Sequence, residues 1–286
     1  MRVLSRWALK WIAVATAAVL AAAAAISARA DAPLVLGVLP NLTARQIVET
    51  YRPLADYLET RLGRPVTLVS ARDFKTFVAR TRQGEYDIVL TAPHLAWLAA
   101  EEGRYRPLLK YAQPARGLLV VATHSPIEGV ADLRGRTVAA GDALAVTVLA
   151  LEAQLAREGL RAGSDYQTRD AGTHLNAVMQ VVNGRADAAM LGLHPYNLLP
   201  LELRRQLRVL AETPPLASLM YLAHPDLPQA TCDAVRDALV AFAKTREGRA
   251  FLAQGGYRGF APVDGDELQA LQPYALQARE RLRARP

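Results

Sequence analysis

The sequence predicts an α/β protein made of two similar lobes, each with a mostly parallel sheet flanked by helices. Short apolar runs typical of buried strands alternate with segments of helical periodicity, which is the pattern of parallel βαβ units. A run of strand, helix, strand, helix and strand occurs twice, ending at residues 83–90 (QGEYDIVL) and again at residues 183–190 (NGRADAAM). In both copies a glycine ends a helix and an aspartate precedes a buried strand. A single doubly wound sheet with a helical tail is the alternative.

The first half of the chain contains three predicted strands and two predicted helices. The apolar run at 34–39 (LVLGVL) lies between two prolines and indicates a buried strand. Residues 44–62 place apolar side chains at helical spacing and end before a glycine, which predicts a helix. The other elements of this half are strands at 66–70 and 86–90 and a helix at 73–84.

The second half repeats this order, and helices follow it. Its predicted strands lie at 136–140, 166–170 and 186–191, with helices at 144–158 and 173–182. Apolar runs at 117–123, 207–211 and 218–223 are interpreted as crossover strands that lead to the second lobe and back. Tail helices are predicted at 228–245, 247–254 and 266–283. The expected division is 31–117 for the first part of lobe one, 118–212 for lobe two, and 213–286 for the return to lobe one with the C-terminal helices.

The N-terminus predicts an exported protein. Arg2, Arg6 and Lys10 precede an apolar stretch at 11–26, and a small-x-small sequence then ends at Ala30, as in a cleavable secretory signal. We therefore expect a signal peptide at 1–30 and a periplasmic location. The alternative is that the segment stays in place as a membrane anchor.

Composition and motifs exclude several classes of function. The four basic residues of the signal account for four of the formal charge of +7, so the mature chain carries about +3 and offers no electrostatic case for nucleic-acid binding. The nucleophile elbow, the P-loop, the dinucleotide fingerprint and paired histidine metal motifs are absent from the sequence. Its single cysteine, Cys232, is expected to be a buried side chain. We expect no enzyme activity, no cofactor and no metal.

The expected ligand site lies at the carboxyl ends of the parallel strands, where helix N-termini present free N–H groups. Loops and strand ends in these places supply the candidate ligand-binding residues Asn41, Thr43, Arg72, Phe74, Thr91, His94, Asp142, His174 and His194. Arginine and histidine there can donate to an anionic ligand, and a protonated histidine adds positive charge. For each residue a structural role is the alternative: a helix cap, a core side chain, or a solvated charge.

Several segments resemble the phosphate/phosphite/phosphonate-type periplasmic binding proteins of ABC importers. They are LGV at 36–38, YRPLADYL at 51–58, GEYDI at 84–88, SPI at 125–127, DLRGRTVA at 132–139, GTHLNA at 172–177 and EGRAFL at 247–252. The resemblance covers essentially the whole mature chain and implies a periplasmic-binding-protein-like fold, with two lobes joined by two crossover strands and hinged around a trapped ligand.

The resemblance also implies partners and a further candidate residue. It implies a small, anionic, phosphonate-like or phosphate-like ligand, delivery to a membrane permease, and a monomer. Where phosphonate binders of this family carry an S-T-S run, residues 142–147 (DALAVT) keep an aspartate and one hydroxyl, on Thr147, which joins the candidates. An aromatic residue that is frequent after the third strand is here Thr91. The alternative function is a ligand-sensing periplasmic subunit of a membrane receptor, with a ligand other than a phosphonate.

Overall fold

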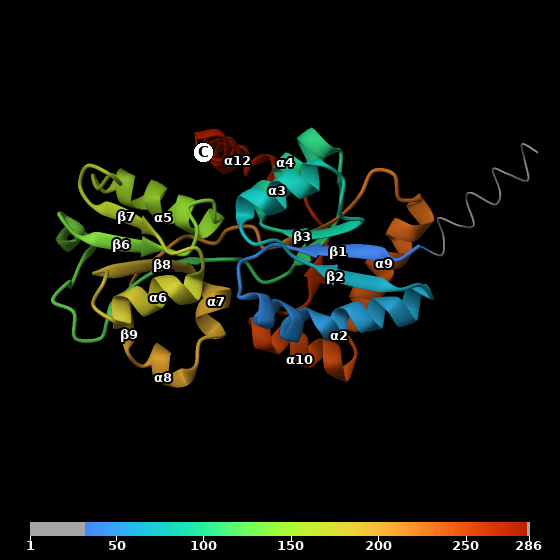
Figure 1. Ribbon diagram of the computed structural model, residues 1–286, viewed down its shortest axis with the longest axis horizontal. Helices are drawn as coiled ribbons and strands as arrows, with labels where there is room; N and C mark the ends of the chain where they lie inside the picture. Colours follow the sequence, from blue (N-terminus) through green and yellow to red (C-terminus); the bar gives the residue numbers. More distant parts are fainter. Residues whose placement is uncertain (1–31, 285–286) are drawn as a thin grey trace, which may run out of the picture.

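The computed structural model describes residues 32–284 and contains two sheets that lie side by side, each covered by helices on both faces (Figure 1). The expected signal peptide therefore lies outside the described residues. Across 32–284, none of the helices has the length and apolar character needed to cross a bilayer.

The first sheet has six strands in the order β11-β4-β10-β3-β1-β2. Its strands are β1 (Leu34–Val38), β2 (Val66–Val69), β3 (Ile88–Thr91), β4 (Arg106–Tyr111), β10 (Met220–Ala223) and β11 (Phe260–Ala261). Strand β1 pairs in parallel with both β2 and β3, whereas β10, which comes from the end of the chain, runs antiparallel between β3 and β4. The first lobe is thus completed by the chain after it returns from the second.

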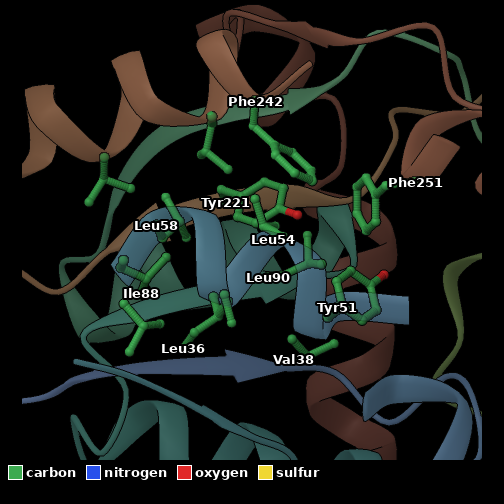
Figure 2. Close-up of a cluster of buried hydrophobic side chains, with 14 of the residues drawn as sticks. Leu36, Val38, Tyr51, Leu54, Leu58, Ile88, Leu90, Tyr221, Phe242 and Phe251 are labelled. Carbon is green, nitrogen blue, oxygen red and sulfur yellow. The ribbon is translucent and has the colours of Figure 1, made fainter. Parts of the chain in front are cut away.

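Helices from both ends of the chain cover the first sheet. They are α2 (Ala44–Leu62), α3 (Phe74–Arg82), α4 (Pro93–Gly103), α9 (Gln229–Phe242), α10 (Arg246–Gly255), α11 (Gly265–Gln269) and α12 (Gln272–Ala284). Figure 2 shows one face of the core, where Leu54 of α2 and Phe242 of α9 pack with Ile88 and Leu90 of β3. This apolar burial attaches the C-terminal helices to the N-terminal sheet.

The second sheet has five strands in the order β7-β6-β8-β5-β9. Its strands are β5 (Gly117–Ala122), β6 (Thr137–Ala140), β7 (Gln167–Asp170), β8 (Ala188–Gly192) and β9 (Leu207–Glu212). Its helices are η1 (Val130–Leu133), α5 (Val146–Arg157), α6 (His174–Val182), α7 (Leu193–Asn197) and α8 (Leu201–Arg204). Strand β6 is parallel to β7 and β8, and β5 is antiparallel to β8 and β9.

The repeated glycine-aspartate pattern has the same structural role in both lobes. The Asp87 carboxylate accepts a hydrogen bond from the Val35 N–H at the start of β1, at 2.8 Å. The Asp187 carboxylate accepts from the Thr137 N–H at the start of β6, also at 2.8 Å. Each aspartate therefore fixes the beginning of the parallel strand beside its own. The match between 83–90 and 183–190 thus reflects a repeated element of the fold.

Two segments carry the chain between the sheets. Residues 112–116 lead from β4 into β5, and residues 213–219 lead from β9 back to β10. They run antiparallel and meet at a bridge between Ala115 and Leu216. The Thr213 hydroxyl also accepts a hydrogen bond from the Gly117 N–H at 2.9 Å. The expected pair of crossovers is present, and the strands β5 and β9 themselves belong to the second sheet.

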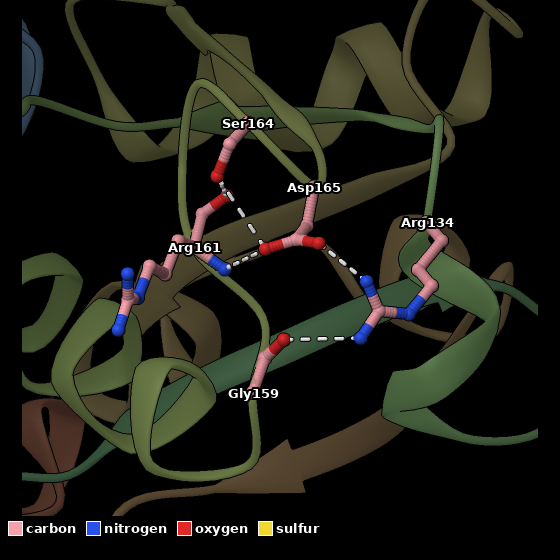
Figure 3. Close-up of polar contacts among 5 residues, drawn as sticks. All are labelled: Arg134, Gly159, Arg161, Ser164 and Asp165. Carbon is pink, nitrogen blue, oxygen red and sulfur yellow. Dashed lines mark hydrogen bonds and ion pairs between the residues drawn. The ribbon is translucent and has the colours of Figure 1, made fainter.

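An exposed loop before the edge strand β7 is held by one carboxylate. The Asp165 side chain accepts hydrogen bonds from the Arg161 N–H at 2.8 Å and the Ser164 hydroxyl at 3.4 Å, and it pairs with the Arg134 guanidinium (Figure 3). Arg134 also donates to the Gly159 carbonyl at 3.0 Å. These contacts join the connection before β7 to the turn before β6, at a distance from the site described below.

Three elements of the first lobe were not expected from the sequence, the two-residue strand β11, helix α4 and strand β4. Helix α4 is buried from Pro93 to Ala99, so it lacks the alternation of apolar and polar residues on which a helix prediction depends. Strand β4 contains a proline and two basic residues within six positions, which hides its strand character. Consequently His94, expected in a loop after β3, lies in the first turn of a helix.

Candidate ligand-binding cleft

A cavity of about 70 Å³ lies between the two lobes and is lined by residues of both. Lobe one contributes Leu39 and Asn41 after β1 and Phe74 at the start of α3. Lobe two contributes the start of α5 and the residues after β8. The crossing segments close one side through residues 113–116 and 218–219. The cavity therefore lies at the carboxyl ends of parallel strands in both sheets, where we expected a ligand site.

Two long helices begin at this cavity without a capping side chain. Ala92 is the N-cap residue of α4 and Ala145 is that of α5, and both line the cavity. Alanine offers no side-chain oxygen to the first N–H groups of a helix, so these groups must find partners elsewhere. At α5 they are available to an acceptor in the cavity, and the positive end of the helix dipole favours an anion there.

Three neutral oxygen atoms of the lining residues are buried without a hydrogen-bond partner in the described chain. They are Asn41 Oδ1 after β1, Thr147 Oγ1 in the first turn of α5, and Ser218 Oγ in the returning crossover. Buried polar groups in native proteins almost always have a partner, and an empty ligand site is one of the few places where they do not. Sequence analysis missed Ser218, because it assigned this residue to the start of a crossover strand at 218–223 and considered only the carboxyl ends of strands; in the structure β10 begins at Met220 and Ser218 precedes it.

Two histidines face this cavity, and both are held neutral. Burial, with a smaller contribution from the nearby His194 ring, lowers the pKa of His174 to about 4. Burial also lowers the pKa of His194 to about 4. The His174 ring packs directly on Gly141, where a Cβ atom would lie 2.2 Å from Nδ1. These imidazoles act as neutral hydrogen-bonding groups at neutral pH rather than as the cations that sequence analysis considered.

Charge is scarce at this site. Arg116 is the one arginine, lysine or carboxylate side chain among the lining residues within 32–284, and it pairs with Glu212 at 2.7 Å. Apolar side chains such as Leu193 and Leu219 form most of the wall. Within the same range, side chains do not gather into a cluster that could hold a metal ion. Recognition here depends on hydrogen bonds and shape more than on opposite charge.

The structure brings five of the ten candidate residues into the cavity lining. These are Asn41, Phe74, Thr147, His174 and His194. Phe74 also belongs to the core of the first lobe, so it has both of the roles considered for it.

The other five candidates lie around the cavity with structural contacts of their own. Thr43 caps α2 and accepts from the Gln46 N–H. The Arg72 side chain is 85% exposed and pairs with Asp73 at 3.1 Å. Asp142 accepts from the Leu144 N–H at 2.7 Å and, with Arg72, lines a separate open depression between the lobes.

Thr91 and His94 are more deeply buried. Thr91 ends β3, next to Ala92 of the cavity lining, and its hydroxyl is unpaired in the part of the chain that the structure describes. His94 is completely buried, and its Nε2–H donates to the Leu144 carbonyl at 2.8 Å. Since His94 belongs to α4 of lobe one and Leu144 precedes α5 of lobe two, this hydrogen bond connects the lobes.

Solved structures with a similar fold are binding proteins of transporters. A binding protein component of an ABC phosphonate transporter from Pseudomonas aeruginosa has a TM-score of 0.78 and 18% identity, covering 89% of this chain and 90% of its own. PhnD1 from Prochlorococcus marinus, in complex with methylphosphonate, has a TM-score of 0.78 and 15% identity, covering 87% and 98%. The alkanesulfonate-binding protein SsuA from Xanthomonas axonopodis pv. citri, bound to MOPS, has a TM-score of 0.63 and 18% identity, covering 89% and 94%.

At these identities the solved structures show a shared fold, and a match to the sequence itself shows the family. Residues 36–268 match the family described as ABC transporter, phosphonate, periplasmic substrate-binding protein. The match spans both lobes, both crossovers and all the cavity-lining residues. The chain therefore belongs to the periplasmic substrate-binding proteins of ABC phosphonate transporters, which bind small molecules and are not enzymes.

Proposed function

We propose that this protein captures a small alkylphosphonate in the cavity between its lobes and presents it to a membrane permease. The observation that carries this proposal is the set of unpaired neutral oxygens on Asn41, Thr147 and Ser218 around one interlobe cavity. Hydroxyl groups and helix N–H groups donate to phosphonyl oxygens without bringing in a buried cation. The related PhnD1 was solved with methylphosphonate, which supports this ligand class.

The apolar wall favours a phosphonate with a carbon substituent over inorganic phosphate. Ala145 and Val146 at the start of α5 line the cavity together with Leu39 and Pro93, and Thr147 supplies the one hydroxyl of residues 142–147. Fewer hydroxyls leave fewer donors for a fourth oxygen, and a buried oxygen without a donor costs about 1–3 kcal/mol. An alkyl group in that place would contact carbon atoms instead.

Isothermal titration calorimetry of residues 31–286 with methylphosphonate, phosphate and phosphite tests this proposal. We expect methylphosphonate to bind more tightly than phosphate. Thr147→Val should weaken methylphosphonate binding by about tenfold, because it removes one hydroxyl donor of about 1–1.5 kcal/mol. Thr168→Val is the matched control, since Thr168 is exposed on β7 of the same lobe. Equal binding by the Thr147 variant, or failure of all three probes to bind, would contradict the proposal.

We also propose that the chain is exported by cleavage after Ala30 and works as a monomer. The basic, apolar and small-residue parts of 1–30 support a signal peptide. N-terminal sequencing of protein recovered from the periplasm should begin at Asp31, and sedimentation should give the mass of one chain. A retained N-terminus or a stable dimer would contradict these two expectations. We also propose that the boundaries between the lobes lie at residues 117 and 212, because the segments 112–116 and 213–219 that carry the chain between the sheets end and begin there.

A further inference from the structure

His194 contacts both lobes at the edge of the cavity. It lies in α7 of lobe two, and its Nδ1 is 3.0 Å from the carbonyl oxygen of Gly255 at the end of α10 in lobe one. Its ring also stacks on Tyr257 of lobe one, with ring centroids 4.9 Å apart. Gly255 permits this approach, because a Cβ atom there would lie 2.5 Å from the Tyr257 ring and 3.2 Å from the His194 ring.

The Gly255 contact fixes which nitrogen of His194 carries the proton. A carbonyl oxygen accepts hydrogen bonds and cannot donate them, so Nδ1 must be the protonated nitrogen. In the neutral ring Nε2 then carries a lone pair and is an acceptor. Nε2 is buried, and residues 32–284 place no partner within hydrogen-bond distance of it. His194 Nε2 is thus an acceptor without a donor in the described chain, as is Asn41 Oδ1 of the same lining, and both are open to a donor on a ligand.

The surroundings oppose a second proton on His194. His174 lines the same cavity and lies close enough to interact electrostatically with His194, so a positive charge on one ring disfavours a charge on the other. Tyr257, against which the ring stacks, is a neutral phenol whose pKa burial raises well above its usual value. Arg116, which lines the same cavity, is already neutralised by Glu212 at 2.7 Å. No carboxylate lines the described cavity to stabilise an imidazolium.

We infer that His194 selects oxyacids that keep one acidic proton, by accepting a hydrogen bond from the P–O–H group of a monoprotonated phosphonate. This inference rests on the proposed function, and it adds a hydrogen-bond donor to what the ligand must present. The remaining phosphonyl oxygens accept from the hydroxyls and helix N–H groups of the cavity. Because Nδ1–H of the same ring holds the Gly255 carbonyl, the ring that accepts the ligand proton also joins the two lobes.

An acceptor at His194 would distinguish phosphonates from sulfonates, which have a similar shape but differ in whether they keep an acidic proton. Phosphoryl groups lose their second proton at about pH 6, so a monoprotonated fraction remains near neutrality. A sulfonate is a strong acid and has no proton to donate at that pH. At His194 a sulfonate oxygen would meet a lone pair rather than a donor. Methylphosphonate and methanesulfonate are therefore a matched pair of probes.

Calorimetric titration of both probes between pH 5.5 and 8.5 tests the inference. The wild-type protein should bind methylphosphonate at least about tenfold more tightly than methanesulfonate at pH 7, the factor expected for one unpaired buried acceptor. Its methylphosphonate affinity should fall by about tenfold for each pH unit above the second ionisation of the ligand, with uptake of one proton per ligand bound. Titration in buffers of different ionisation enthalpy measures that uptake.

Two variants and a control assign these effects to His194. His194→Phe keeps a ring against Tyr257 but has no acceptor, so the two probes should bind within about threefold of each other. His194→Gln restores an acceptor oxygen and should recover part of the preference. His124→Gln, on the exposed surface of lobe two, should behave as the wild type does. Thermal unfolding shows whether each variant is folded.

The outcomes distinguish this inference from the function on which it rests. Equal binding of both probes by the wild type, or an unchanged preference in a folded His194→Phe protein, would overturn the inference and leave phosphonate capture standing. If neither probe binds the wild type at any pH, the proposed function fails and the inference fails with it.

Discussion

Burial of His94 makes a specific prediction about stability in acid. This histidine is completely buried in α4, and its Nε2–H donates to the Leu144 carbonyl at 2.8 Å across the lobe boundary. Burial lowers the pKa of His94 to about 4, although the hydrogen bond to Leu144 acts in the opposite direction. The folded protein therefore keeps this ring neutral at pH values where the unfolded chain protonates it.

The sign and the size of the effect follow from that difference in pKa. The pKa of His94 is about 4 when folded, below the value of about 6.5 for an unfolded histidine. Its contribution to stability is then fully present above about pH 6.5 and is lost as the pH falls, because protonation favours the unfolded chain. The loss amounts to about 2 kcal/mol at pH 5 and about 3 kcal/mol at pH 4.

Urea denaturation of wild type and His94→Gln at pH 7 and pH 5 measures this effect. Glutamine keeps an N–H donor for the Leu144 carbonyl but does not titrate. Between pH 7 and pH 5 the variant should lose about 2 kcal/mol less stability than the wild type. The comparison is needed because His174 and His194 also destabilise the fold in acid. His124→Gln, exposed in lobe two, should match the wild type. If His94→Gln loses as much stability as the wild type, burial does not hold His94 neutral.

Three further substitutions test other contacts. Gly141→Ala would place a Cβ atom 2.2 Å from Nδ1 of His174. It should lower the free energy of unfolding, measured by urea denaturation, by about 1–3 kcal/mol and weaken methylphosphonate binding. An unchanged affinity would show that His174 is not part of the ligand site. Asp165→Asn should destabilise the protein at pH 7 and much less at pH 3. The hydrogen bond from the Arg161 N–H lowers the pKa of Asp165, so the carboxylate contributes to folding stability above its unfolded pKa and loses that contribution on acidification. Equal destabilisation at both pH values would contradict this prediction. Arg281→Ala removes a charged contact between α12 and α5. It should lower the free energy of unfolding by about 1–3 kcal/mol, again measured by urea denaturation. A loss below about 0.5 kcal/mol would show that this contact of α12 with lobe two does not stabilise the protein.

The lobes and the edge that carries the site could be predicted from the sequence, because both depend on periodic patterns. The continuous apolar run at 34–39 is a central strand, and the matched segments at 83–90 and 183–190 close equivalent halves. Helix α4 could not be found this way. It is enclosed between the sheet, α3 and the tail helices, so its buried residues have no polar face to set a period.

The candidate residues were harder to predict, because a position at a strand end does not fix the direction of a side chain. Arg72 carries the charge expected of an anion site, yet it extends into solvent and pairs with its neighbour Asp73. Ser218 lies in an irregular crossover and reaches the cavity only because that segment packs between the lobes. Three-dimensional contact between distant segments decided both cases, and local sequence does not record it.

Histidine shows why residue type alone gives an incomplete account of chemistry. His94, His174 and His194 were considered as potential positive charges for an anion, and all three have a pKa lowered to about 4 by burial. A neutral imidazole has one donor and one acceptor, and its fixed partner decides which nitrogen has which role. At His94 the partner is a backbone carbonyl of the opposite lobe, and at His194 it is another. Each ring thereby joins the lobes through its donor nitrogen, and at the cavity this leaves His194 an acceptor to which only a ligand that carries a proton can donate.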